Sequence, residues 1–353
     1  MSDSQATKGK RARRLRAMLW SIVLIAVGSM TLPLTGYLYT AAVHAEQAAG
    51  EQGANPRSDY WRDARGGMAG YTAVIGQETS VLIQSRGQVW REVRNGPVAT
   101  LGAIMVLGII VALLAFHFTK GGIKLEHRTG KTVLRWPMID RVLHWYTAIL
   151  FIILAITGMS ILWGRAVLIP VLGKEGFAAW AALAKPVHDY LALFFTAGLV
   201  VMLLKWFKHN VFTDYDRQWF KQKGGLFDGS HPPAGFANAG EKAYYWVLVI
   251  GGAAIVISGF FPLFPNLGFS RAAMQNANII HSVSSLIVIT AVFAHIYLGT
   301  LGSEGALEGM WTGDVDEGWA KQHHNLWLEE VKKQGAAPAQ AGDAPGTSAT
   351  ASA

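Results

Sequence analysis

The chain has 353 residues, of which 51% are hydrophobic and only 15% charged, and its apolar runs of about twenty residues indicate a helical integral membrane protein. It has no cysteine, which excludes disulfides, iron–sulfur ligation, thiolate-bound zinc and covalent attachment of c-type haem, so any redox metal must be held by His or Met. The formal net charge is +8, and the basic residues are concentrated beside the ends of the apolar runs. The positive-inside rule explains this distribution, so no nucleic-acid partner is expected.

The first 97 residues combine an export signal with a polar segment. A basic start precedes an apolar run, so residues 1–45 are predicted to be a signal peptide or a signal anchor. Both remain open, because Val43-His44-Ala45 suits cleavage while the run is long enough to span a membrane. Residues 46–97 are predicted to be an extracytoplasmic segment, with a strand-like piece at 80–84 and turns around Gly87 and Asn95-Gly96-Pro97.

The rest of the chain alternates apolar runs with polar connections. Residues 98–119 are predicted to be one extra transmembrane helix, which leads to a basic cytoplasmic loop at 120–140. Residues 141–302 are predicted to form an all-α four-helix transmembrane bundle. Its spans are expected near residues 141–163, 186–207, 243–263 and 276–301.

The connections of the bundle set its orientation. The basic connection 208–242 belongs inside, whereas 264–275 holds only Arg271 and belongs outside. Residues 164–185 are also expected to be a connection, although they carry three basic residues. Two C-terminal parts follow, and both are placed in the cytoplasm. They are a cytoplasmic segment at 303–334 and a disordered tail, rich in Ala, Gly, Pro, Ser and Thr, at 335–353.

Four histidines lie inside the predicted bundle. His281 and His295 share one span, and fourteen residues advance a helix by about 1400°, so both rings leave the same face about 21 Å apart. The topology places His144 with His295 at the cytoplasmic depth and His188 with His281 at the external depth. A packing role for each histidine is the alternative, but four such residues at two matched depths argue against it.

The two histidine pairs suit b-type haem. A buried imidazole stays neutral and offers a ring nitrogen to iron, and two imidazoles fill both axial positions, which favours electron exchange over substrate binding. Arg141 and Lys185 each precede a histidine by three residues, so they are candidates for pairing with haem propionates or for contacting lipid headgroups. Residues 318–333, with Trp319 and Trp327, are predicted to lie on the membrane or on a partner.

Several motifs, taken together, resemble the γ subunit of membrane-bound formate dehydrogenase, a quinone-linked dihaem cytochrome b. The resemblance covers about residues 136–330, and the first hundred residues resemble only the longer forms of that family. The first motif alone would also suit a hydrogenase or thiosulfate-reductase cytochrome. The motifs are Ile139-Asp-Arg-x-x-His-Trp145, Lys185-x-x-His188, Phe236-Ala-Asn-Ala-Gly-Glu-Lys242, Ile280-His281, His295-Ile-Tyr297 and Gly318-Trp-Ala-Lys-x-His-His324.

The resemblance implies haem ligation by His144, His188, His281 and His295, and a menaquinone or ubiquinone site beside the cytoplasmic haem. Asn238, Gly240 and His295 match the family's quinone-contacting residues. Glu241 stands where the family usually has Gln, so it either carries protons towards the quinone or weakens the match at that position. A plain turn and helix cap is the alternative explanation of residues 238–241.

The resemblance also implies a function. The chain would be the electron-transfer subunit of a formate:quinone oxidoreductase in the bacterial inner membrane, with two b haems and no catalytic residue of its own. Its partners would be an iron–sulfur β subunit, docked in part by residues 46–97, and a catalytic α subunit with molybdenum or tungsten. Two alternatives remain open: a cytochrome b of a hydrogenase or another quinone-linked dehydrogenase, and a proton-coupled transporter, which would be colourless.

Overall fold

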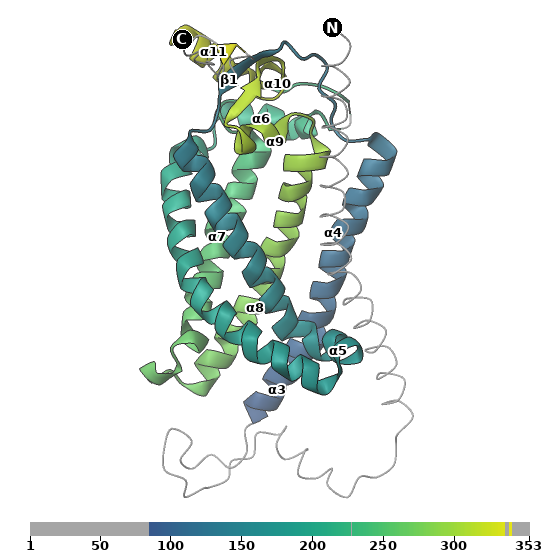
Figure 1. Cartoon of the computed structure of the whole chain (residues 1–353), viewed down its shortest axis with the longest axis vertical. Coiled ribbons are helices and arrows are strands. Elements are labelled where there is room, and N and C mark those ends of the chain that lie inside the picture. Colours follow the sequence, from purple (N-terminus) through teal and green to yellow (C-terminus); the bar gives the residue numbers. More distant parts are fainter. Residues whose placement is uncertain (1–84, 227, 336–338, 341–353) are drawn as a thin grey trace, which may run out of the picture. The chain divides into compact units, whose positions relative to one another are not determined.

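A computed structural model describes residues 85–226, 228–335 and 339–340 of the chain (Figure 1). The described part contains four helices that are long and apolar enough to cross a membrane, as predicted for a helical membrane protein. The predictions for residues 1–45, for the strand-like piece at 80–84 and for most of 46–97 and 335–353 lie outside the described residues. Their boundaries therefore stay predictions.

The first described helix begins within the segment that was predicted to be extracytoplasmic and irregular. Helix α3 (Ser85–Val93) runs through a π-helical turn, Arg94–Val98, into α4 (Ala99–Lys120). The predicted turns at Gly87 and Asn95-Gly96-Pro97 are therefore wrong. Proline has no N–H, and the wider π-helical turn changes the hydrogen-bond pattern where Pro97 interrupts the ladder, so the helix continues.

Helix α5 (Met138–Trp206) contains two of the predicted spans in one element of 69 residues, interrupted at Gly173. Residues 164–185, which were predicted to connect two spans, are helical on both sides of the interruption at Gly173. Gly173 has φ 71°, a left-handed conformation that glycine adopts without steric cost. The basic Arg165, Lys174 and Lys185 lie at exposed positions, so they do not oppose the helix.

The remaining long helices are α7 (Ala239–Leu263) and α8 (Arg271–Tyr297), which a π-helical turn at Leu298–Gly302 extends. Shorter helices lie between or after them: α6 (Asp214–Lys221), α9 (Ala306–Trp311), α10 (Glu317–His323) and α11 (Asn325–Lys333). Short 3₁₀ turns occur at Phe207–His209, Lys223–Gly225 and Pro265–Leu267.

A small antiparallel sheet was not predicted. Its order is β2 (Asp314–Asp316), β1 (Lys131–Leu134) and β3 (Ala339–Gln340), with Val133 opposite Val315. Both valines are buried. The pair Ala339–Gln340 falls in the tail that was predicted to be disordered, and its pairing with β1 differs from that prediction.

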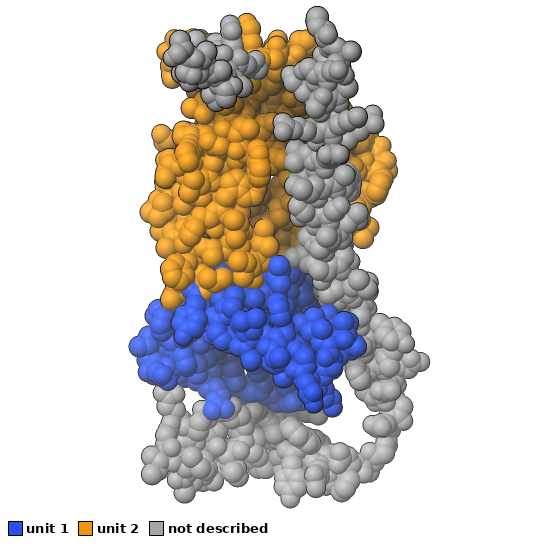
Figure 2. Space-filling model, viewed as in Figure 1, with its two compact units in different colours: residues 1–110, 154–190, 258–283 blue, residues 111–153, 191–257, 284–353 orange. Residues whose placement is uncertain are grey.

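The chain divides into two compact units, coloured separately in Figure 2. The described residues of unit 1 are 85–110, 154–190 and 258–283. Those of unit 2 are 111–153, 191–257 and 284–340, with the gaps stated above. Helices α4, α7 and α8 each have residues in both units. The residues of α5 belong first to unit 2, then to unit 1 and then to unit 2 again.

Within unit 2, helices α10 and α11 pack against β1 and β2 around a hydrophobic cluster. Trp319 is 5% exposed and Trp327 is 7% exposed, so the prediction that residues 318–333 lie on the membrane or on a partner is wrong for these two rings. The sequence shows that this stretch has an apolar face, but not what covers that face. The buried members of the cluster are Val133, Val315, Trp319, Ala320, Trp327 and Leu328.

Candidate functional site

Unit 1 brings together the first pair of predicted histidines. His188 comes from the second half of α5 and His281 from α8, and their ring centres lie 6.2 Å apart at an interplanar angle of 78°. These two residues are 93 positions apart in the chain. Their contact agrees with the pairing by depth that the sequence suggested.

Thr157 on α5 orients the His188 ring. Its hydroxyl donates to the carbonyl of Leu154 at 3.2 Å, so its oxygen is left to accept from Nδ1–H of His188 at 2.9 Å. A proton on Nδ1 leaves Nε2 with a lone pair, the form in which imidazole binds a metal. Thr157 was not identified from the sequence, because a threonine in an apolar span is equally common as a packing residue.

Two glycines give the unit 1 histidines their space. A Cβ at Gly158 would lie 3.1 Å from Cε1 of His188, and a Cβ at Gly259 would lie 3.1 Å from Cε1 and from Nδ1 of His281. Both distances are shorter than ordinary packing contacts, so each glycine lets a helix backbone approach a ring closely. Neither glycine was identified from the sequence. Each is a glycine inside an apolar helix, where glycine lowers helix propensity and no local feature of the sequence explains its presence. That was the signal from which a close contact could have been predicted.

Unit 2 brings together the second pair. His144, near the start of α5, and His295, near the end of α8, have ring centres 6.1 Å apart at an interplanar angle of 55°. Tyr244 of α7 stacks on His295 at 4.5 Å and 4°, and Trp206 lies 6.4 Å from His144 at 24°. Nδ1 of His144 is buried and has no hydrogen-bond partner in the described part of the chain.

The geometry of both pairs fits a haem between two axial imidazoles. An imidazole nitrogen lies about 2 Å from a metal that it binds, so ring centres on opposite sides of one metal lie about 6 Å apart. The observed separations are 6.1 and 6.2 Å. Close approach at the two glycines and an unpaired buried nitrogen on His144 also suit a bound group. The residues present therefore fit b-type haem.

The two basic residues that were predicted as propionate partners have partners within the chain. Arg141 donates from Nη1 to the carbonyl of Trp311 at 2.8 Å. Lys185 forms an ion pair with Asp189, one helical turn later. Neither contact reaches a ligand histidine, so these two assignments stay predictions.

The segment 238–241 caps helix α7. The N–H of Asn238 donates to Oε2 of Glu241 at 2.9 Å, and the N–H of Glu241 donates to Oδ1 of Asn238 at 2.9 Å. These reciprocal bonds form a capping box, which matches the alternative explanation of this segment. Gly240 packs beneath Trp219, because a Cβ there would lie 2.7 Å from that ring. None of these contacts tests a quinone-binding role.

A buried cluster around Arg135 in unit 2 lies beside this cap and was not predicted from the sequence. The Arg135 side chain is 4% exposed and is surrounded by the rings of Phe236, Trp319 and Trp327 at 4.9, 5.1 and 5.2 Å. Its Nη2 donates to the carbonyl of Phe236 at 2.9 Å and lies 3.4 Å from Oε1 of Glu241. Burial lowers the pKa of Arg135, and the charge of Glu241 opposes that shift.

His324 completes the cluster. It is 1% exposed, Nδ1 lies 3.0 Å from the carbonyl of Gly235, and Nε2 lies 3.8 Å from Oε1 of Glu241. The sequence offered only the motif that contains this histidine. Nothing local in that motif indicates that Arg135, Glu241 and His324 meet, since they come from three separate parts of the chain.

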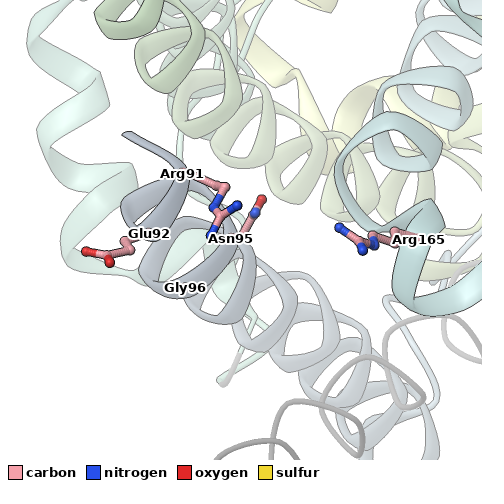
Figure 3. Close-up of a pocket in the computed structure, with 5 residues that line it drawn as sticks. All are labelled: Arg91, Glu92, Asn95, Gly96 and Arg165. Atoms are coloured by element: carbon pink, nitrogen blue, oxygen red, sulfur yellow. The ribbon is translucent and has the colours of Figure 1, made fainter. Parts of the chain in front are cut away.

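A pocket of 570 Å³ lies in unit 1 (Figure 3). Its lining residues are Arg91, Glu92, Asn95, Gly96 and Arg165. A second pocket, of 410 Å³, lies in unit 2 and is lined by Arg141 and by apolar and aromatic neighbours. None of the four paired histidines lines either pocket.

The comparisons with known proteins agree with this geometry. A family model described as prokaryotic cytochrome b561 matches residues 135–313, about half of the chain. The "Formate dehydrogenase, cytochrome b556(fdo) subunit" of Escherichia coli (strain K12) is 27% identical over 206 residues, which are 57% of this chain and 94% of that protein. The "Formate dehydrogenase, cytochrome b556 subunit" of Haemophilus influenzae is 25% identical over 213 residues, 59% of this chain and 87% of that protein.

A further relative is the "Formate dehydrogenase, nitrate-inducible, cytochrome b556(Fdn) subunit" of Escherichia coli (strain K12), which is 26% identical over 212 residues, 58% of this chain and 94% of that protein. The chain is longer than these relatives, consistent with an N-terminal extension. The region matched by the family model contains all four paired histidines. The chain therefore belongs to the prokaryotic cytochrome b561 family, and it is a membrane cytochrome b with a role in electron transfer.

Proposed function

We propose that this chain is the cytochrome b subunit of a membrane-bound formate dehydrogenase, and that it passes electrons through two b-type haems to a quinone. The observation that carries the proposal is the presence of two separate histidine pairs with ring centres 6.1 and 6.2 Å apart, one in each unit. The names of the three relatives support formate as the source of the electrons.

Each histidine pair holds one haem. His188 and His281 bind the first, with Thr157 fixing the tautomer of His188, and His144 and His295 bind the second. When bound, haem supplies a centre that accepts and releases one electron. A haem held by two imidazoles would have no position open for a substrate, so the chain would carry electrons and would have no formate chemistry of its own. Arg141 and Lys185 are candidates to contact the propionates.

The quinone binds beside the pair His144–His295. Asn238, Gly240, Glu241 and His295 are the candidate contacts. Oδ1 of Asn238 accepts from Glu241, so its amide NH₂ is the group left to donate to a quinone carbonyl. Gly240 is covered by Trp219 on its Cα side, so its contribution would come from backbone groups. Tyr244, one turn after Glu241 on α7, stacks on His295 and connects this end of the helix to the haem pair.

The electrons enter from partner subunits. The partners would be an iron–sulfur subunit, which would supply electrons to a haem held by His188 and His281, and a catalytic subunit with molybdenum or tungsten, which would oxidise formate. The chain lies in the bacterial inner membrane with its C-terminus in the cytoplasm, as the distribution of Lys and Arg favours. His144 and His295 would hold the haem nearer the cytoplasmic side, which would supply electrons to a quinone bound there.

The test is a haem count on the complex purified through the full chain, together with its visible spectrum after adding formate. The wild type is expected to hold two b haems per chain that formate reduces. His281→Ala and His144→Ala are each expected to lose one haem, while His127→Gln, an exposed histidine, is expected to keep both. A well-folded chain without haem would refute the proposal, and reduction by hydrogen but not formate would replace it with the hydrogenase alternative.

A further inference from the structure

The buried ring of His324 has a fixed tautomer. Its Nδ1 lies 3.0 Å from the carbonyl oxygen of Gly235, and a carbonyl only accepts, so Nδ1 carries a proton. The neutral ring then has a bare lone pair on Nε2. That atom is buried and has no hydrogen-bond partner among the described residues. A buried acceptor without a donor is costly, so its presence calls for an explanation.

The neighbour of this lone pair is another acceptor. Nε2 of His324 lies 3.8 Å from Oε1 of Glu241, which is too long for a hydrogen bond. A carboxylate and a neutral imidazole nitrogen both lack a proton, so neither can donate to the other. If Nε2 and Oε1 moved slightly closer, one added proton would form a hydrogen bond between them. The two groups therefore form a site for a single exchangeable proton.

The charges around the pair limit it to one proton. Glu241 faces Arg135 and Lys242, and His324 faces Arg135 and His323. Burial and then the charge of Arg135 hold the pKa of His324 well below its ordinary value, although the Gly235 carbonyl opposes this shift. Burial also lowers the pKa of His323 to about 4. Before the proton binds, the pair carries the single negative charge of Glu241, which the positive charge of Arg135 balances.

The Glu241 side chain is partly exposed, and it lies about one helical turn before Tyr244, which contacts His295. The side chain of Glu241 is 45% exposed, whereas that of His324 is 1% exposed. Glu241 and Tyr244 are three residues apart on α7, so they share a face of that helix, and Tyr244 stacks on His295. The carboxyl group is thus placed to move between the buried ring and a molecule beside the haem pair.

We propose that Glu241 and His324 form a proton-holding pair that gives one proton to the quinone reduced beside His144 and His295; this inference rests on the proposed function. Reduction of a quinone to a quinol adds two electrons and two protons. The electrons come from formate through the haem sites. The O–H bond of the Glu241 carboxylic acid breaks as one O–H bond of the quinol forms, water supplies the second proton, and the pair is then reprotonated from water.

The test compares complexes that carry the wild-type chain, Glu241→Gln, His324→Asn and the control Glu330→Gln. Asn retains an N–H that can reach the Gly235 carbonyl, and it removes the Nε2 position of the ring. Glu330 is exposed on α11. Its substitution by Gln removes one negative charge, as Glu241→Gln does, and leaves the pair intact. In each complex, formate first reduces the haems without quinone, and decylubiquinone then reoxidises them at several pH values in a stopped-flow spectrometer.

The expected results distinguish a loss of proton transfer by the pair from a loss of electron transfer to the haems. Haem reduction by formate should be equal in all four complexes. Reoxidation by decylubiquinone should slow as pH rises in the wild type and in Glu330→Gln, and should be at least about 100-fold slower and independent of pH in Glu241→Gln and His324→Asn. Infrared spectra recorded across the same pH range should show a carboxylic acid band that Glu241→Gln removes and His324→Asn shifts.

Haem reoxidation at the wild-type rate in either Glu241→Gln or His324→Asn would overturn the proposal. So would slow reoxidation with an unchanged pH profile and no infrared change, because that result indicates a structural role. If Glu241→Gln does not assemble, His324→Asn decides the question alone. If formate does not reduce the wild-type haems but a quinol does, the proposed function fails, and the pair is tested in the reverse direction, in which it accepts a proton from the quinol.

Discussion

The hydroxyl of Thr157 lies 2.9 Å from Nδ1 of His188 and accepts its hydrogen bond. A hydrogen bond from the outer N–H of an imidazole to an acceptor orients the ring and raises its basicity towards a metal. Thr157→Val keeps the shape and removes the acceptor, which leaves a buried N–H unpaired. We expect about 10- to 100-fold weaker haem retention at this pair and a higher midpoint potential, because a less basic imidazole stabilises ferric iron less. A redox titration that resolves two b haems measures both effects.

The matched control for this prediction is Thr157→Ser, which retains the hydroxyl and should keep the wild-type potential. The potential of the haem at His144 and His295 should not move in either variant, because Thr157 makes its contact in unit 1. A titration in which Thr157→Val leaves both potentials unchanged would show that the hydrogen bond has no influence on the site.

A methyl group at Gly158 or Gly259 should disturb the haem of unit 1. A Cβ would lie 3.1 Å from the His188 or His281 ring, so Gly158→Ala and Gly259→Ala push a ring out of position at a cost of about 1–3 kcal/mol. Each variant should retain less haem, measured as the pyridine haemochrome per chain. Gly108→Ala is the control, because a Cβ there meets nothing within 4 Å, and full haem content in all three variants would contradict the prediction.

The stacking of Tyr244 on His295 should support the second haem site. The rings lie 4.5 Å apart and nearly parallel, and such a pair contributes about 0.5–1.5 kcal/mol beyond burial. Tyr244→Leu should lower the midpoint temperature for haem release from this pair, followed by its absorbance. Tyr244→Phe preserves the ring and should behave like the wild type. Equal release temperatures for Phe and Leu would mean that stacking is not the source of stability.

The C-terminal histidines should make the chain sensitive to acid. The pKa of His323 is lowered to about 4 and that of His324 is lowered well below its ordinary value, so the folded state stays unprotonated while the unfolded state gains protons below about pH 6.5. Folding stability should therefore fall as pH is lowered from about 6.5 to about 4, by up to ~3 kcal/mol for His323.

Thermal unfolding in detergent, followed by the fluorescence of the buried Trp319 and Trp327, measures this dependence. His323→Gln should reduce the slope in this pH window, whereas the exposed His127→Gln should not. A stability that stays constant between pH 6.5 and 4 would contradict the assignment of a neutral buried histidine.

The electron-transfer role and the helical membrane fold were predicted from local features of the sequence and are confirmed by the family match and the long apolar helices. The pairing of His144 with His295 was inferred from depth alone, and the structure brings the rings together. Local features also failed in two places. A polar, glycine-containing stretch suggested turns near Pro97, and the gap between two apolar runs suggested a connection at 164–185, but the first segment is helical and the second is helical on both sides of Gly173.

The sequence by itself determined where apolar helices form, because a membrane span requires about twenty apolar residues. It also determined which histidines lie at equal depth, and an imidazole buried in the membrane without a partner costs free energy. Only the tertiary structure decided that Gly158 and Gly259 adjoin the rings, that Thr157 orients His188, and that β1 pairs with β2. It also decided that Arg135, Glu241 and His324 share one buried cluster. These contacts join residues far apart in the chain, and side-chain packing, not local hydropathy, sets them.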